Sequence, residues 1–364
     1  MYTRQDDIVL GTSSLVSLEM SNLSVMKCGS QNLVCYTSFS EVVVAPVPGT
    51  SSYPIGNPGS GGAAASVVSK GSPTCIPCET SQKLRCMFID AGRGVADGVG
   101  YILILGSFGA KLVSLNGEDQ LWYCSMETLA GQDDRIRPDA MYTRAAVLCR
   151  GDDNVIAIGL SNGYICLVYR ASGELMRRLD GGQSSGTSRS SVVAMASTGA
   201  HLVSVNELNC ICVFDTQEDY ALIQRISLPP AVEDLSTTLC CQGDNIVVGY
   251  LSGHIRVYSA KMGYTLFEIT GHGRCVTGLS AHPNKEEFGS CGEDQCINVW
   301  SLPGSSAKEA AGAAEASSVE LVHHEMVANA LLTGTEWSGD GRLYAVAYDS
   351  DIVRVVMPQA GRKM

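Results

Sequence analysis

The chain has 364 residues, of which 45% are hydrophobic and 17% are charged, so it can bury a large core. Its formal net charge of -12, from 25 basic and 37 acidic residues, works against binding nucleic acid, whose phosphates need clustered positive side chains. No apolar run reaches the roughly 18 residues of a spanning helix, and the N-terminus lacks a secretion signal. We therefore expect a cytoplasmic protein with no membrane span and no nucleic-acid partner.

The first predicted element is a short strand at Ile8-Val9-Leu10, which has no hairpin of its own. A hairpin, in which a polar turn joins two apolar strands, closes near Ala45. Residues 46 to 82 are rich in Pro, Gly and Ser, which predicts a mobile insertion. A second, weaker hairpin closes near Leu115.

Four clearer hairpins follow, at residues 155–168, 201–214, 245–258 and 288–300. Residues 303 to 318 form an Ala/Gly/Ser tract with too little bulky apolar surface to pack, and we predict a second mobile insertion there. A seventh hairpin, again weaker, closes near Val356.

The spacing of these hairpins predicts the fold. Their closing residues lie 42 to 70 residues apart, and the shortest spacings match the roughly 40 to 45 residues of a four-stranded propeller blade. The sequence therefore predicts an all-β protein with one domain over residues 1–364, a seven-bladed β-propeller of four-stranded antiparallel blades. The last blade lacks an outer strand, and pairing with Ile8-Val9-Leu10 would close the ring and remove its open edges.

One blade carries residues that resemble a known repeat. Gly271-His272 is followed 28 positions later by Trp300, and this frame resembles that of WD40 repeats, with Ser301 in place of the usual Asp. The resemblance implies that His272, Ser290, Asp294 and Trp300 form a buried hydrogen-bonded set, in which the carboxylate accepts from the imidazole and the indole N–H finds a partner. The sequence has all four residues in this blade alone, and their implied role is structural.

A closer resemblance extends over nearly the whole chain. Segments such as Asn22-Leu23-Ser24-Val25, Cys291-Gly292-Glu293-Asp294 and Ala345-Val346-Ala347-Tyr348-Asp349 are similar to the family of WD repeat-containing protein 54. This resemblance implies a cytoplasmic adaptor that binds other proteins, with no catalytic residues, no cofactor and no metal.

Two other functions remain open. Cys75, Cys78 and Cys86 lie close together in the sequence, and such a cluster of thiols suits a redox-sensitive regulator. Ordinary loop cysteines are the simpler interpretation. A structural zinc would need further ligands. A propeller hydrolase is the third possibility, but each pair of acidic residues is adjacent in sequence at a predicted turn, where solvated charge is expected. His323-His324 is interpreted as an incomplete structural histidine site.

Partner binding is predicted on one face of the ring. The turns between the two inner strands of each blade emerge on that face, and six of them carry an apolar or aromatic residue: Phe39, Phe108, Leu160, Leu208, Leu251 and Tyr348. Alternatively, several of these side chains fold inward. Arg135, Arg137 and Arg144 form a basic patch after the second blade, which suits an acidic or phosphorylated peptide unless the arginines are merely solvated.

Overall fold

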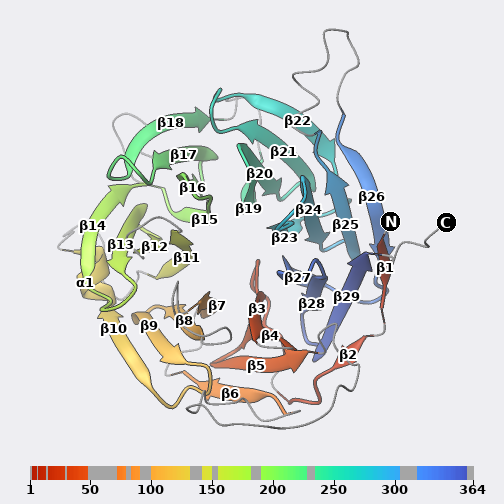
Figure 1. The fold of residues 1–364 in the computed structure, drawn as a ribbon, viewed down its shortest axis with the longest axis horizontal. Coiled ribbons are helices and arrows are strands. Elements are labelled where there is room, and N and C mark those ends of the chain that lie inside the picture. Colours follow the sequence, from red (N-terminus) through yellow and green to blue (C-terminus); the bar gives the residue numbers. More distant parts are fainter. Residues whose placement is uncertain are drawn as a thin grey trace, which may run out of the picture.

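A computed structural model of the chain describes residues 2–5, 7–13, 15–28, 31–47, 72–78, 83–90, 100–131, 142–149, 155–181, 190–227, 234–303 and 318–358. Within these residues, the strands form seven antiparallel sheets arranged as blades around a central axis (Figure 1). The predicted seven-bladed propeller is confirmed. In each blade the strands follow one another from the axis to the rim, so that consecutive strands pair.

The first four blades are continuous in sequence. Blade 1 contains β3 (Ser24–Cys28), β4 (Gln31–Ser38), β5 (Glu41–Val47) and β6 (Thr74–Pro77). Blade 2 contains β7 (Arg85–Asp90), β8 (Gly100–Gly106), β9 (Gly109–Ser114) and β10 (Gln120–Ser125), followed by the short helix α1 (Met126–Ala130). Blade 3 contains β11 (Thr143–Cys149), β12 (Val155–Leu160), β13 (Tyr164–Tyr169) and β14 (Leu175–Asp180). Blade 4 contains β15 (Val192–Ser197), β16 (His201–Asn206), β17 (Cys210–Asp215) and β18 (Ala221–Ser227).

The last three blades include the seam of the ring. Blade 5 contains β19 (Ser236–Gln242), β20 (Asn245–Tyr250), β21 (His254–Ser259) and β22 (Thr265–Thr270). Blade 6 contains β23 (Val276–Ala281), β24 (Glu287–Gly292), β25 (Cys296–Ser301) and β26 (Glu320–Met326). Blade 7 contains β27 (Leu332–Trp337), β28 (Leu343–Ala347) and β29 (Ile352–Pro358), and its outer edge is supplied by β1 (Tyr2–Arg4) and β2 (Ile8–Val9).

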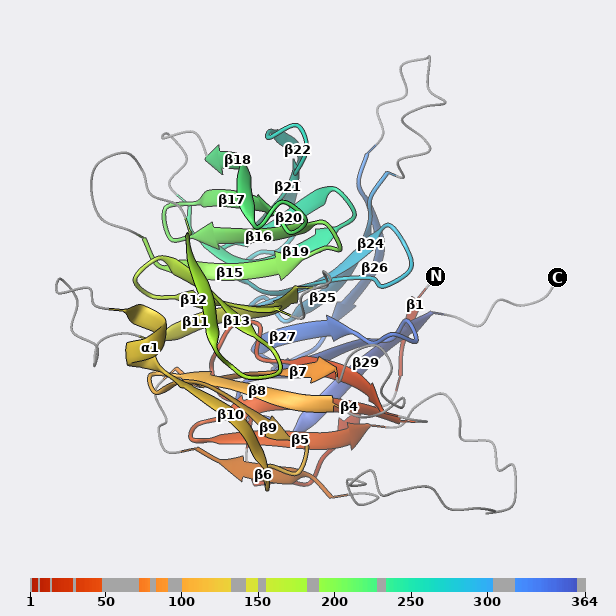
Figure 2. The same ribbon diagram turned by 60° about the vertical axis from the view of Figure 1, so that its left-hand side comes forward.

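The N-terminal segment closes the ring, as predicted, but it begins earlier than expected. Ile8 pairs with Val353, and Tyr2 pairs with Pro358 further along the same strand. The two short strands pair with different parts of β29, and β1 lies beside β29 in both views (Figures 1 and 2). This pairing covers the edge that blade 7 would otherwise expose.

The hydrophobic core lies between blades. In the described residues, each pair of neighbouring blades shares one cluster of buried side chains, seven clusters in all. Alternate residues of a middle strand supply the two neighbours: on β12, Ile156 and Ile158 face blade 2, whereas Val155 and Ala157 face blade 4. A strand buried on both faces therefore needs a continuous apolar run.

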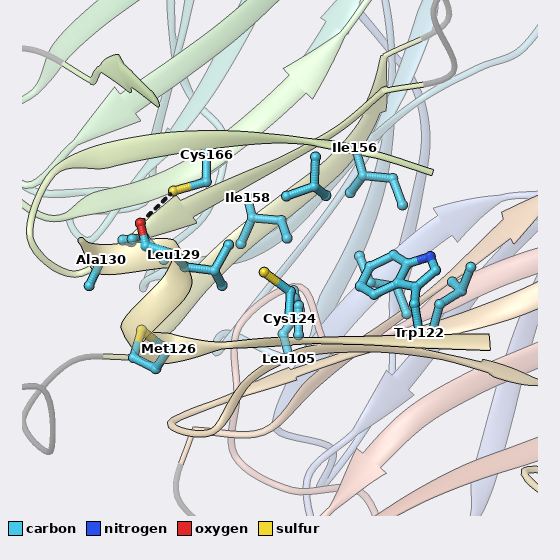
Figure 3. Close-up of a cluster of buried hydrophobic side chains, with 14 of the residues drawn as sticks. Leu105, Trp122, Cys124, Met126, Leu129, Ala130, Ile156, Ile158 and Cys166 are labelled. Atoms are coloured by element: carbon cyan, nitrogen blue, oxygen red, sulfur yellow. Dashed lines mark hydrogen bonds between the residues drawn. The ribbon is translucent and has the colours of Figure 1, made fainter. Parts of the chain in front are cut away.

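Helix α1 completes the cluster between blades 2 and 3 (Figure 3). Leu129 and Met126 are buried in the same cluster as Ile158, and the Cys166 thiol donates to the Leu129 carbonyl over 3.1 Å. The sequence analysis did not predict this helix, because five residues are too few to show a helical period. Its position depends on packing against the neighbouring blade.

The predicted insertions need one correction. Residues 46 to 82 were expected to be mobile throughout, but β6 lies inside that range and pairs with β5, with Ile76 opposite Val42. Ile76 is buried in the cluster between blades 1 and 2, which explains why this stretch joins the sheet despite its polar surroundings. Residues 48–71 and 304–317, the larger parts of the two predicted insertions, lie outside the described residues.

Candidate interaction surface

One face of the ring carries two kinds of connection. The innermost strands run in the same direction, so the turns between the second and third strands of every blade emerge on a single face. The segments that lead from an outer strand to the next innermost strand emerge there too. We call this the turn face.

Four of the six predicted contact residues are exposed on the turn face. The exposed fractions are 66% for Phe39, 60% for Leu208, 49% for Leu251 and 41% for Tyr348. These side chains are available to a partner, as the prediction requires.

The prediction is wrong for Leu160 and holds only in part for Phe108. Leu160 is 0% exposed, because it shares the face of β12 with Ile156 and Ile158 and packs toward blade 2. Phe108 is half-buried: it packs against the cluster between blades 1 and 2 and stacks on Tyr123, with ring centroids 6.4 Å apart. Both side chains fold inward, as the alternative interpretation foresaw.

Of the three arginines in the predicted basic patch, only Arg144 lies within the described residues. Arg144 lies in β11, the innermost strand of blade 3, and not in the preceding insertion where it was expected. Arg135 and Arg137 lie outside the described residues. Binding of an acidic or phosphorylated peptide by these arginines stays a prediction.

Three exposed apolar side chains gather where blade 7 meets blade 1. Ser17 donates its backbone N–H to the Thr37 carbonyl over 2.9 Å, and Asp349 donates to the Val16 carbonyl over 3.0 Å. These bonds tie three segments together, and each segment presents one exposed side chain: Leu18, Phe39 and Tyr348. We call these three residues the seam patch.

A second group lies between blades 4 and 5. The Asn209 side chain accepts from the Ser236 backbone N–H over 2.8 Å, and the Leu251 N–H donates to the Leu235 carbonyl over 2.8 Å. The three joined segments expose Leu208, Leu235 and Leu251, which we call the leucine patch.

Sequence reasoning missed two members of these patches, Leu18 and Leu235. Both lie before an innermost strand and not at a hairpin turn, so the hairpin pattern of the sequence does not single them out. The available signal was a single leucine between polar residues, as in Ser17-Leu18-Glu19. That signal is weak, since isolated exposed leucines are common on protein surfaces.

Phe39 also has an unusual backbone. It occupies the tight turn between β4 and β5 with a φ of 46°, in the left-handed region that bulky L-residues avoid. Only about a third of the side chain is buried, and this burial does no more than offset the strain. Phe39 therefore adds little net stability, which favours a functional role for its phenyl ring.

The N-terminal segment covers the centre of the turn face. Innermost strands β23 and β27 each carry a bulge near their start, at Thr277 and Thr333, whose carbonyls lie outside the regular ladder. These carbonyls accept the backbone N–H groups of Ser21 and Asn22 over 2.9 and 3.2 Å. The segment thus caps the mouth of the central channel.

Behind this cap lies a central cavity of about 180 Å³. Two carboxylates, from Glu19 and Glu336, contribute to its lining. Glu19 is 3.8 Å from the Arg85 guanidinium, and Glu336 accepts the Val25 N–H over 2.9 Å. Both acidic groups are therefore engaged by the protein itself.

The four WD40-type residues of blade 6 are joined by hydrogen bonds. Trp300 Nε1 donates to Ser290 Oγ over 2.9 Å, Ser290 Oγ lies 2.8 Å from His272 Nε2, and His272 Nδ1 lies 2.9 Å from Asp294 Oδ1. A neutral imidazole with its proton on Nδ1 satisfies every bond in this series. Burial opposes ionisation of Asp294, but the bonds from His272 and two backbone N–H groups outweigh it and hold its pKa below the ordinary value.

His323 and His324, interpreted from the sequence as an incomplete structural histidine site, lie within β26, the outer strand of blade 6. His324 Nδ1 is 2.8 Å from the Asn298 side-chain oxygen, and His323 packs near the Tyr2 ring at 6.4 Å. His323 therefore contributes to the junction of blade 6 with the closing strand, whereas His324 bonds within blade 6.

The predicted cysteine cluster does not lie on one face of its strand. Cys75 is exposed on β6, whereas Ile76 and Cys78 face the cluster between blades 1 and 2. Residues an odd number of positions apart on an extended strand face opposite sides, so the Cys75 and Cys78 thiols do not converge. Cys86, on β7, packs against the same cluster as Cys78.

The described residues contain no group of three or more His, Cys, Asp or Glu side chains placed to hold a metal ion. No helix in the same part of the chain is long and apolar enough to cross a membrane.

Comparison with known proteins supports the repeat class. The sequence model of the family WDR54 matches residues 172–357, just over half of the chain. WD repeat-containing protein 54 from Mus musculus is 26% identical over 158 residues, which are 43% of this chain and 45% of that protein. Echinoderm microtubule-associated protein-like 2 from Rattus norvegicus is 31% identical over 83 residues, 23% of this chain. The match spans only 13% of that protein's length.

Solved structures show the same fold at low sequence identity. The WD40 β-propeller domain of Doa1 has a TM-score of 0.62 at 15% identity, covering 98% of this chain and 97% of that one. A chain of a mitotic checkpoint complex has a TM-score of 0.64 at 15% identity, covering 97% and 94%.

Proposed function

Because the chain belongs to the WDR54 family of WD-repeat β-propellers, we propose that it is a non-catalytic platform that binds other proteins or peptides through its turn face. Propellers of this class generally serve as interaction scaffolds. The proposal places the chain in the cytoplasm, where it supports assembly or signalling.

One observation carries this proposal: two groups of exposed apolar side chains are held on the same face by hydrogen-bonded segments. Binding energy at protein interfaces is concentrated in a few aromatic and aliphatic anchors, and a rigid mounting lowers the entropy lost on binding. The seam patch and the leucine patch supply such anchors on a ring whose second and third strands in each blade are largely buried.

The polar groups inside the molecule support a structural and not a catalytic role. The carboxylates that line the central cavity are engaged by Arg85 and by the Val25 N–H. The tetrad of blade 6 is enclosed, with Ser290 at 0% exposure. A serine that no substrate can reach does not act as a nucleophile.

The test compares partners recovered by proximity labelling in cells with three versions of the chain. One version carries Phe39→Asn and Tyr348→Ser on the turn face, and another carries Met262→Ser and Tyr264→Ser. The latter two side chains are 60% and 52% exposed but lie at the turn between β21 and β22, on the opposite face. We expect some partners to be recovered with the parent chain and with the Met262/Tyr264 version but not with the Phe39/Tyr348 version. If all three recover the same partners, the turn face is not the binding surface.

A further inference from the structure

Two free cysteines share one face of β17, the third strand of blade 4. Cys210 and Cys212 are two positions apart on an extended strand, so both side chains point into the cluster between blades 3 and 4. Cys210 is the first residue of the strand, next to the turn face, and is 9% exposed. Cys212 lies deeper and is 0% exposed. The fold therefore places a pair of thiols at the end of this cluster that is nearest the turn face.

The strands on either side of β17 bring polar groups to the same face. On β18, Ser227 is opposite Cys210 and Arg225 is opposite Cys212. On β16, Ser204 is opposite Cys212, and its buried hydroxyl has no hydrogen-bond partner among the described residues. Directly opposed residues of an antiparallel pair lie on one face, so hydroxyl groups and a guanidinium border the two sulfurs in an otherwise apolar cluster.

These neighbours favour ionisation of one thiol of the pair. The hydrogen bond from the Cys212 thiol lowers the pKa of Cys210 below its ordinary value, although burial opposes this effect. A hydrogen bond from Ser227 and the charge of Arg225 lower the same pKa further, against a smaller effect of the Asp180 charge. The pKa of Cys212 is raised, because its proton is held in the bond to Cys210. The pair thus gives up one proton readily, from the more exposed sulfur, and keeps the other.

Other cysteines lack this combination. Burial raises the pKa of the Cys166, Cys240 and Cys291 thiols. Cys75 is exposed on β6, but Cys78 faces the opposite side of that strand. Reaction with an oxidant requires a thiolate, and a reversible product requires a second thiol within reach. Cys210 and Cys212 meet both requirements.

We propose that Cys210 is a site of reversible oxidation by hydrogen peroxide, and that Cys212 resolves the oxidised sulfur as an intramolecular disulfide. The Cys210 thiolate attacks one peroxide oxygen, so that an S–O bond forms, the O–O bond breaks, and the departing hydroxide takes up a proton to become water. The Cys212 sulfur then attacks the sulfenic sulfur of Cys210. An S–S bond forms, the S–O bond breaks, and the Cys212 proton leaves with the hydroxyl group as a second water. The two sulfurs are oxidised and the peroxide is reduced.

The geometry of the strand makes this disulfide easy to reduce. Cα atoms two positions apart on a strand are about 6.6 Å apart, near the upper end of the roughly 4.4 to 6.8 Å that disulfides span. Closing the bond between Cys210 and Cys212 therefore strains β17, and strained disulfides are reduced readily. Peroxide sets the oxidised state and a dithiol reductant restores the thiols. This modification goes beyond the platform function and does not depend on it.

Mass mapping of the full chain tests the proposal. The chain is reduced, freed of reductant and exposed to hydrogen peroxide at about pH 7 for increasing times, and the remaining thiols are alkylated. The tryptic peptide of residues 190–225 contains Cys210 and Cys212 and no other cysteine. We expect this pair to lose its alkylation sites at least about tenfold faster than Cys75 and Cys166, since a thiolate reacts and a thiol does not. Dithiothreitol should restore both sites.

Variants assign the role of each sulfur. With Cys212→Ser, the sulfenic acid of Cys210 has no thiol to resolve it, and dimedone should trap it several-fold more than in the parent chain. With Cys210→Ser, Cys212 should stay reduced. Cys166→Ser is the matched control, because Cys166 is also buried as the third residue of a third strand, β13, and its loss should leave oxidation of the pair unchanged. Circular dichroism checks that each variant is folded, and mapping of the parent chain needs no variant.

Three outcomes would overturn the inference. The first is oxidation of Cys75 or Cys166 before the pair. The second is the same preference for the pair in denaturing urea, where Ser227 and Arg225 no longer lie beside it. The third is oxidation of Cys210 to a sulfinic acid while Cys212 can still be alkylated, because Cys212 then resolves nothing. None of these measurements involves a binding partner, so they are independent of the cellular test of the turn face.

Discussion

Replacing Phe39 with asparagine separates folding from binding at one residue. Phe39 is 66% exposed, so about a third of its roughly 200 Å² is buried, and losing that burial costs about 1.7 kcal/mol. The φ of 46° costs a bulky residue about 1 to 2 kcal/mol, whereas asparagine adopts this conformation readily. The two contributions offset each other, and we expect the free energy of unfolding to stay within about 1 kcal/mol of the parent.

Binding should respond much more strongly than stability. Truncating an aromatic anchor in the middle of an interface typically costs at least about 2 kcal/mol, which corresponds to about a 30-fold weaker Kd. Urea denaturation followed by tryptophan fluorescence measures the stability, and the recovery of partners by proximity labelling measures the loss of binding. Met262→Asn is the matched control, because Met262 is 60% exposed on the opposite face and should change neither quantity.

Two results would refute this reasoning. A loss of several kcal/mol of stability would mean that Phe39 supports the fold and that its exposed ring is not free for a partner. Unchanged binding would mean that the strained turn has no role in recognition. Phe39→Gly repeats the test with a residue that carries no side chain and accepts the same φ.

Three further predictions concern stability. Ser290→Ala should lower the free energy of unfolding by about 3 kcal/mol in urea denaturation, because it leaves the buried His272 and Trp300 nitrogens without their shared partner. Tyr2→Ala should cost about 3 to 5 kcal/mol and should speed hydrogen exchange in β29, since Tyr2 is 3% exposed and packs 5.6 Å from the Trp337 ring. Lowering the pH from about 7.5 to about 5 should destabilise the chain, because burial, and then the Lys285 charge, lower the pKa of His282. In the unfolded chain the His282 imidazole takes up a proton near pH 6.5, whereas in the folded chain it stays neutral to a lower pH. The free energy of unfolding therefore decreases as the pH falls through that range.

Each of these predictions has a control. Ser204 occupies the position in blade 4 that Ser290 has in blade 6, and its buried hydroxyl has no hydrogen-bond partner among the described residues. Ser204→Ala should therefore be neutral or slightly stabilising, and equal losses at the two serines would contradict the tetrad argument. Thr3→Ala should change stability by less than about 0.5 kcal/mol, since its side chain is only partly buried. His282→Asn should flatten the pH dependence, and an unchanged slope would assign it to other groups.

The periodic features of the sequence were enough to predict the architecture. Each blade repeats an apolar hairpin because its middle strands are buried on both faces, as the continuous run of β12 illustrates. The lone strand at Ile8 implied closure, because an unpaired edge on blade 7 would be costly. The tetrad of blade 6 was implied by the resemblance to WD40 repeats, and the pairing of β24 with β25 brings Ser290 and Trp300 within hydrogen-bond reach.

Tertiary structure decided which residues face a partner. Leu160 is the last residue of β12 and is buried, whereas Leu251 lies one residue beyond β20 and is about half exposed. The difference depends on where each strand ends, because a shift of one residue turns a side chain to the opposite face, and the sequence pattern does not fix strand ends to one residue. Likewise Leu18, Phe39 and Tyr348 are distant in sequence and form one surface only because the ring closes between them. Strand repeats are local and can be derived from sequence, whereas a surface shared by three segments depends on contacts between residues far apart in the chain.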